Sequence, residues 1–184
     1  PELLDGTIVL SGGQLTIRDD LVIQGLGADL LTVDANGQSR VFYVDQNVDC
    51  TIADLTITGG SATTGGAIHV ATNAVLNLVN VVLSNNAASA SGGGLYCLGG
   101  TASIIGSRFE ANSALNGGGV YNQQGSLTIT GSTFSGNSGL ALGGGVSNKQ
   151  GTLAIASSTF TANTSNNFGG AIHNEPSSTT TVTG

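Results

Sequence analysis

The sequence predicts an all-β protein folded as a parallel β-helix, a solenoid in which the chain advances one coil at a time. Three residue columns with one shared period carry this prediction. Glycine pairs recur with their second glycine 28, 25, 26 and 25 residues apart, at Gly66, Gly94, Gly119, Gly145 and Gly170. An asparagine three residues after an apolar residue recurs in steps of 26, 25 and 26, at Asn86, Asn112, Asn137 and Asn163. An aliphatic column repeats those three steps, at Leu78, Ile104, Ile129 and Ile155.

Each repeat contains short segments that alternate between apolar and polar residues and are separated by Gly, Ser or Asn. Such alternation predicts strands, and the segments are too short and too rich in flanking glycine for helices. One repeat cannot bury its own apolar face, but stacked repeats can. We therefore expect about seven coils of 25–26 residues, stacked about 4.8 Å apart in three parallel sheets around a dry core.

The whole chain, 1–184, is expected to form one domain and to be a fragment of a longer repetitive chain. Residues 1–64 would form irregular coils and residues 65–184 the regular ones. Segments ending at Leu10, Ile17 and Ile23 are expected to build a first coil, and "VFYV" lies one repeat before "AIHV". The segment "GLGADLLTVDANGQSR" is expected to be a longer excursion or an extra half-coil.

The repeated columns are expected to have structural roles. The aromatic rings should stack in the core above Leu83, and stacked asparagine amides at the next turn should form a hydrogen-bonded ladder. The glycine pairs suit a corner that needs a positive φ or a close backbone approach. A phosphate-binding role is disfavoured because no "GK[ST]" follows and no helix is expected. The predicted ladder residues are Asn86, Asn112, Asn137, Asn163, Phe109, Phe134 and Phe160.

One further column, on the outer face, contains all three tyrosines and both histidines of the chain. If the residue that follows each glycine pair points inward, its successor points outward. Two interpretations remain open: a self-stacking ladder that stiffens one face, or an exposed stripe that binds sugar rings or a protein. The column reads Tyr43, His69, Tyr96, Tyr121, Ser147 and His173, and all of these except the serine are candidate binding residues.

Neither a cofactor nor a metal ion is expected. His69 and His173 lie four coils apart, roughly 19 Å by the strand spacing, which is too far to share a metal. The acidic turns Arg18–Asp20 and Val33–Gly37 offer oxygen ligands for Ca²⁺, but neither has a complete calcium-loop pattern, so solvated turns are favoured. Cys50 and Cys97 fall in different columns about two coils apart and are expected to be free, buried thiols.

The charge distribution limits the range of partners. The net charge is −7 and the four basic residues are scattered, which argues against nucleic acid as a partner. No apolar run reaches transmembrane length, so membrane insertion is not expected. The last coil stops mid-turn, and its open strand edges predict further coils, a cap, or end-to-end self-association.

The glycine and asparagine motifs resemble a known family. "GGAI" at Gly65–Ile68 and Gly169–Ile172, with "FxxN" beginning at Phe109, Phe134 and Phe160, is similar to the paired tags of the chlamydial polymorphic outer-membrane protein repeats. The resemblance extends from about Leu21 to the end. It implies a right-handed, pectate-lyase-like β-helix, a handedness that parallel crossovers also favour. It further implies an extracellular, surface-displayed or secreted module for adhesion or spacing, with a glycan or a host cell-surface protein as partner.

Two alternatives compete with this interpretation. A carbohydrate-binding or carbohydrate-degrading pectate-lyase-like enzyme would need clustered carboxylates, with calcium and a basic residue or as a close acid pair. The repeats carry only Arg108, Glu110, Lys149 and Glu175 as charged residues, so we expect no catalytic residues. A leucine-rich repeat has an overlapping period, but it would add a helical segment and a leucine-dense frame that are missing here.

Overall fold

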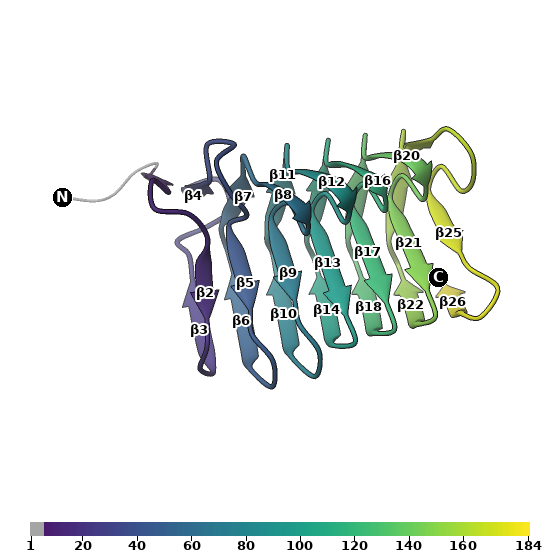
Figure 1. The fold of residues 1–184 in the computed structure, drawn as a ribbon, viewed down its shortest axis with the longest axis horizontal. Coiled ribbons are helices and arrows are strands. Elements are labelled where there is room, and N and C mark those ends of the chain that lie inside the picture. Colours follow the sequence, from purple (N-terminus) through teal and green to yellow (C-terminus); the bar gives the residue numbers. More distant parts are fainter. Residues whose placement is uncertain (1–5) are drawn as a thin grey trace.

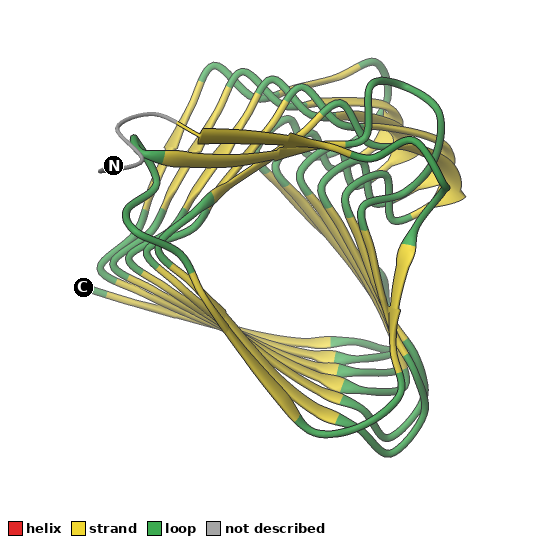
Figure 2. Ribbon diagram, turned by 90° about the vertical axis from the view of Figure 1, so that its left-hand side faces the viewer, coloured by secondary structure: helices red, strands yellow, loops and turns green. Residues whose placement is uncertain are grey.

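The computed structural model describes residues 6–184, and within them the chain forms a parallel β-solenoid of strands and turns with no helix. The coils stack along one long axis (Figure 1). Viewed along that axis, they superpose into a common closed cross-section (Figure 2). The first five residues of the expected domain lie outside the described part of the chain.

Two sheets of seven strands each run the length of the solenoid. Sheet A consists of β1 (Gly6–Val9), β4 (Leu31–Asp34), β7 (Thr56–Thr58), β11 (Val82–Ser84), β15 (Arg108–Glu110), β19 (Thr133–Ser135) and β23 (Thr159–Thr161). Sheet B consists of β2 (Leu15–Ile17), β5 (Phe42–Val44), β9 (Ile68–Val70), β13 (Leu95–Leu98), β17 (Val120–Gln123), β21 (Val146–Lys149) and β25 (Ile172–Asn174).

A third seven-stranded sheet, sheet C, has longer strands. It consists of β3 (Leu21–Gln24), β6 (Asp49–Ala53), β10 (Val75–Val79), β14 (Thr101–Ile105), β18 (Ser126–Thr130), β22 (Thr152–Ala156) and β26 (Thr179–Thr183). In β10, β14, β18 and β22, buried side chains alternate with more exposed ones. This alternation is the pattern that the aliphatic column Leu78, Ile104, Ile129 and Ile155 predicted, and these residues pair in register.

The expectation of three sheets was wrong, because a fourth sheet follows the ladder asparagines. Sheet D consists of β8 (Ser61–Thr64), β12 (Ala87–Ser91), β16 (Ser113–Asn116), β20 (Ser138–Leu142) and β24 (Thr164–Ser165). Its strands are built mainly from Ser, Ala and Thr, and their pairing register shifts at bulges. Segments of this composition lack the apolar alternation that indicates a strand, so the sequence pattern predicts turns here.

The N-terminal coils follow the predicted order but lack sheet D. Strands β1, β2 and β3 form the first coil, one in each of sheets A, B and C. Phe42 pairs with Ile68, as the spacing of "VFYV" and "AIHV" predicted. The segment expected to be an excursion or a half-coil instead supplies β4, which pairs with β1 and β7 and is therefore a regular sheet A strand.

The stacked aromatic column is confirmed. The ring centroids of Phe109 and Phe134 are 4.6 Å apart, and those of Phe134 and Phe160 are 4.8 Å apart. Leu83 precedes Phe109 in the same column and is fully buried. The near-parallel rings, at 8° and 10°, are packed one per coil, so the core repeats along the axis.

Candidate binding surfaces

The predicted asparagine ladder is present, with Asn86, Asn112 and Asn137 buried and Asn163 half-buried. The Nδ2 of Asn112 donates to Oδ1 of Asn137 at 3.0 Å and to the carbonyl oxygen of Leu83 at 2.8 Å. The same pattern links Asn86 to Asn112 and Asn137 to Asn163. Each amide thus satisfies both its own polar atoms and backbone groups of the adjacent coils, which gives the column a structural role.

The structure contains two further ladders, one of asparagine and one of serine, that the sequence analysis did not predict. Asn122 donates from Nδ2 to Oδ1 of Asn148 at 2.8 Å, and Asn148 donates to Asn174 at 2.9 Å. A serine ladder holds the turn between sheets C and A, where the backbone N–H of Ser107 donates to Oγ of Ser132 at 3.1 Å. The repeated "N" two residues after Val120, Val146 and Ile172 was the available signal.

In the outer-face column of tyrosine and histidine, neighbouring rings lie close together over the first four members, stacked in two pairs and tilted by 49° between His69 and Tyr96. The ring centroids of Tyr43 and His69, and those of His69 and Tyr96, are 4.9 Å apart. The rings of Tyr96 and Tyr121 are 5.7 Å apart and nearly parallel, at 3°. The geometry is that of a stacked aromatic ladder, one ring per coil.

The middle of this column is buried, which favours the self-stacking ladder over the exposed stripe. Tyr96 and Tyr121 are only 7% and 5% exposed. The turn between β16 and β17 is tight against Tyr121, since a Cβ atom on Gly117 would lie 3.0 Å from Cα of this tyrosine. The hydroxyl of Tyr96 is also engaged, donating to Oε1 of Gln123 at 2.8 Å. Burial, with smaller effects from Glu175 and Tyr96, raises the pKa of Tyr121 to about 12.

Arg40 holds the N-terminal end of the column. Its guanidinium donates to the carbonyl oxygens of Thr64 and Gly65 and lies 5.6 Å from the ring centroid of Tyr43. His69 is half-buried, and its Nδ1 lies 3.3 Å from Oγ1 of Thr64. Burial, reinforced by the Arg40 charge, lowers the pKa of His69 to about 4, so its ring is neutral at physiological pH.

The column is interrupted at Ser147. Its Oγ is buried and has no hydrogen-bond partner within the described structure. Beyond this gap, His173 pairs with Phe168 at a centroid distance of 6.1 Å. Phe168 is 64% exposed, so accessible aromatic surface lies at the ends of the column and not at its middle.

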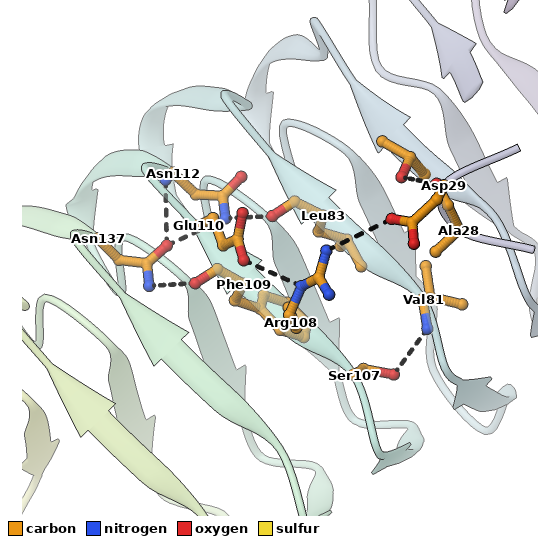
Figure 3. Close-up of polar contacts among 11 residues, drawn as sticks. Ala28, Asp29, Val81, Leu83, Ser107, Arg108, Phe109, Glu110, Asn112 and Asn137 are labelled. Atoms are coloured by element: carbon orange, nitrogen blue, oxygen red, sulfur yellow. Dashed lines mark hydrogen bonds and ion pairs between the residues drawn. The ribbon is translucent and has the colours of Figure 1, made fainter. Parts of the chain in front are cut away.

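The charged residues of sheet A form a cluster with a residue from outside the sheet. The sequence indicated that Arg108 and Glu110 share a strand, but it did not predict the third member, Asp29. Figure 3 shows Arg108 between two carboxylates, with its Nε 3.0 Å from Oε1 of Glu110 and its Nη2 4.0 Å from Oδ1 of Asp29. Asp29 comes from the loop before β4, which is far from Arg108 in the sequence, and no local sequence motif predicts their contact. A guanidinium remains protonated in proteins, so Arg108 offsets part of the negative charge of the two acids and cannot serve as a base.

The cysteines and the acidic turns lie apart from these surfaces. Cys50 on β6 and Cys97 on β13 are free and buried, as expected, and burial raises the pKa of each thiol to about 11. Asp20 accepts a hydrogen bond from the backbone of Asp49, and Asp34 from that of Asn36. Across residues 6–184, no three His, Cys, Asp or Glu side chains gather closely enough to hold a metal ion.

The fold and these ladders define a parallel β-solenoid with one repeat per coil. A family model described as the right handed beta helix region matches residues 40–184. The chain therefore belongs to the right-handed β-helix family. Curated proteins and solved structures gave no significant match. The described residues contain no helix long and apolar enough to cross a membrane.

Proposed function

We propose that this chain is a non-enzymatic structural and adhesive module of a bacterial surface or secreted protein, of the kind formed by the polymorphic outer-membrane protein repeats. One observation carries the proposal: the repeated side chains form buried ladders that run from coil to coil. Asn112, Phe109 and Ser107, all from one coil, each bond to or stack on their equivalents in the next. Such a repeat favours a rod that displays its surface away from an anchor.

The distribution of charge supports the non-enzymatic part. General acid–base catalysis needs a group whose pKa lies near the working pH and which is free to exchange a proton. Glu110 and Asp29 are instead engaged by Arg108, and Glu175 lies 3.8 Å from Lys149. A carbohydrate-degrading enzyme remains the second candidate, because Asp29, Arg108 and Glu110 together resemble a carboxylate pair with a basic residue.

A glycan or a protein of another cell's surface is the proposed partner. Alanine substitutions of Tyr96 and Tyr121 would remove buried rings, so they report on stability and cannot map this contact. Phe168, which is the most exposed aromatic side chain, and half-buried His173 are the better probes.

Adhesion and turnover can be tested separately. Beads coated with the folded protein should be retained on cells or extracellular matrix, and beads coated with heat-unfolded protein should not. Equal retention of both would contradict the adhesive role. Incubation with polygalacturonate and with neutral polysaccharides should release no product, and catalytic release that is lost in Glu110→Gln would overturn the non-enzymatic role in favour of the second candidate.

We also propose end-to-end self-association. Sheets A, B and C each end in β1, β2 or β3 at one end and in β23, β25 or β26 at the other, so a second copy would continue all three in parallel. Exposed apolar side chains at the first coil, such as Ile8 and Val22, favour such a contact. Size-exclusion chromatography should show larger species as concentration rises, and elution independent of concentration would contradict it.

A further inference from the structure

A shallow polar groove of about 430 Å³ runs along the corner where sheet B turns into sheet C. One wall is formed by the side chains of Gln124 and Gln150, and the other by a column of hydroxyl groups from the first residues of β14, β18, β22 and β26. These are Thr101, Ser126, Thr152 and Thr179, and like the glutamines they are exposed. Two successive coils of the groove therefore present the same pair of functional groups, an amide and a hydroxyl.

The floor of the groove is bare backbone, for a structural reason. A Cβ atom on Gly125 would lie 2.6 Å from Oδ1 of Asn122, and one on Gly151 would lie 2.5 Å from Nδ2 of the same asparagine. The second asparagine ladder thus leaves no room for a side chain here. In the first coils, where no asparagine lies beneath, the equivalent positions carry Val48 and Ala74. Gly100, above Cys97, extends the bare floor by one coil, because a Cβ atom there would lie 2.8 Å from the carbonyl oxygens of Ala71 and Ala74.

The groups that line the groove are uncharged and both donate and accept hydrogen bonds. Thr152 Oγ1 donates to Ser126 Oγ at 3.2 Å, and Gln124 Nε2 lies 3.5 Å from Oε1 of Gln150, so neighbouring coils already match in register. Such groups suit a chain of hydroxyl groups. They offer no cation for a phosphate or a carboxylate and no apolar pocket for a peptide side chain.

We propose that this groove binds a neutral glycan chain lying parallel to the solenoid axis. The coils repeat about every 4.8 Å, which is close to the length of one hexose unit in an extended chain, so each coil would contact one sugar. This inference rests on the adhesive part of the proposed function and assigns it a ligand and a face. An anionic glycan is disfavoured by the net charge of −7 and by the uncharged lining.

The test is calorimetric titration of the folded protein with cello-, malto- and manno-oligosaccharides of increasing length, and with galacturonan. At least one neutral series should bind, with an affinity that rises with length and levels off once the groove is filled. The double variant Gln124→Ala/Gln150→Ala should bind about tenfold or more weakly, because two side-chain amides are lost. Gln46→Ala, an exposed glutamine in an earlier turn outside the groove, is the matched control and should bind normally.

Three results would overturn the assignment: no binding of any neutral oligosaccharide, unchanged binding by the double variant, or tighter binding of galacturonan. Unfolding midpoints of the variants, measured in urea, separate lost contacts from lost structure. If coated beads still adhere to cells while no neutral glycan binds, only the groove assignment fails. If beads coated with the folded wild-type protein do not adhere to cells, the proposed function itself is contradicted.

Discussion

A methyl group added to Gly119 would lie 2.5 Å from the carbonyl oxygen of Gly145 and 3.1 Å from Cδ1 of Phe134. The glycine is thus enclosed by the backbone of the next coil on one side and by an aromatic ring of the core on the other. Gly94 faces Phe109, and Gly145 faces Phe160, in the same way. The two sequence motifs recur together because one packs against the other.

Gly119→Ala should therefore destabilise the solenoid by about 3 kcal/mol, as expected for overpacking against backbone that cannot move aside. The control is Gly12→Ala, because a Cβ atom there would meet nothing within 4 Å. Urea unfolding followed by circular dichroism would measure both variants. Equal midpoints for the two would show that the corner can relax.

Removal of one ladder amide should be costly. In Asn112→Ala, the backbone N–H and the Nδ2 of Asn86 both lose their acceptor, and the carbonyl oxygen of Leu83 loses a donor. A loss of about 3 kcal/mol or more in unfolding free energy follows, because the stranded groups are buried. Exposed Asn167, changed to Ala, should alter stability by no more than about 0.5 kcal/mol. A similarly small loss of unfolding free energy for Asn112→Ala would contradict a stabilising role for the ladder between coils.

Two buried serines should respond in opposite directions. Ser147→Ala removes a hydroxyl that has no partner, so stability should rise by up to about 1 kcal/mol. Ser132→Ala removes the acceptor of the Ser107 N–H and a donor to the carbonyl oxygen of Thr130, and should cost about 1–2 kcal/mol. Thermal unfolding of both variants measures the difference. A destabilised Ser147→Ala protein would mean that this hydroxyl has a partner.

His69 should make stability depend on pH in mildly acidic solution. Its pKa is lowered from 6.5 to about 4 in the folded state, so between these values the unfolded chain binds a proton that the folded chain does not. The free energy of unfolding should fall as the pH drops from about 6.5 to about 4, with no further loss from this group below that window.

The size of the His69 effect, after allowance for solvent screening of a half-buried ring, is on the order of 1–2 kcal/mol. Unfolding midpoints across this pH range, for the wild type and for His69→Gln, isolate the contribution. If the variant keeps the full pH dependence, another group is responsible.

The spacing of residues along the chain was sufficient to predict the repeat and therefore most of the fold. Residues such as Ile129, Phe134 and Asn137 recur at the coil period because each must meet its equivalent one coil away, and that requirement is visible as spacing. The outward direction of Tyr121 was also readable, since side chains alternate along a strand.

The fourth sheet, the burial of that face and the contact between Asp29 and Arg108 became visible only in three dimensions. Ser138–Leu142 forms a strand of a fourth sheet without an apolar pattern, because its register is set by the ladder asparagine before it and the glycines after it. Tyr96 and Tyr121 are buried although they lie on the outer face, and the distant loop that carries Asp29 reaches Arg108. The contact between Asp29 and Arg108 joins two segments that share no period, so spacing could not predict it.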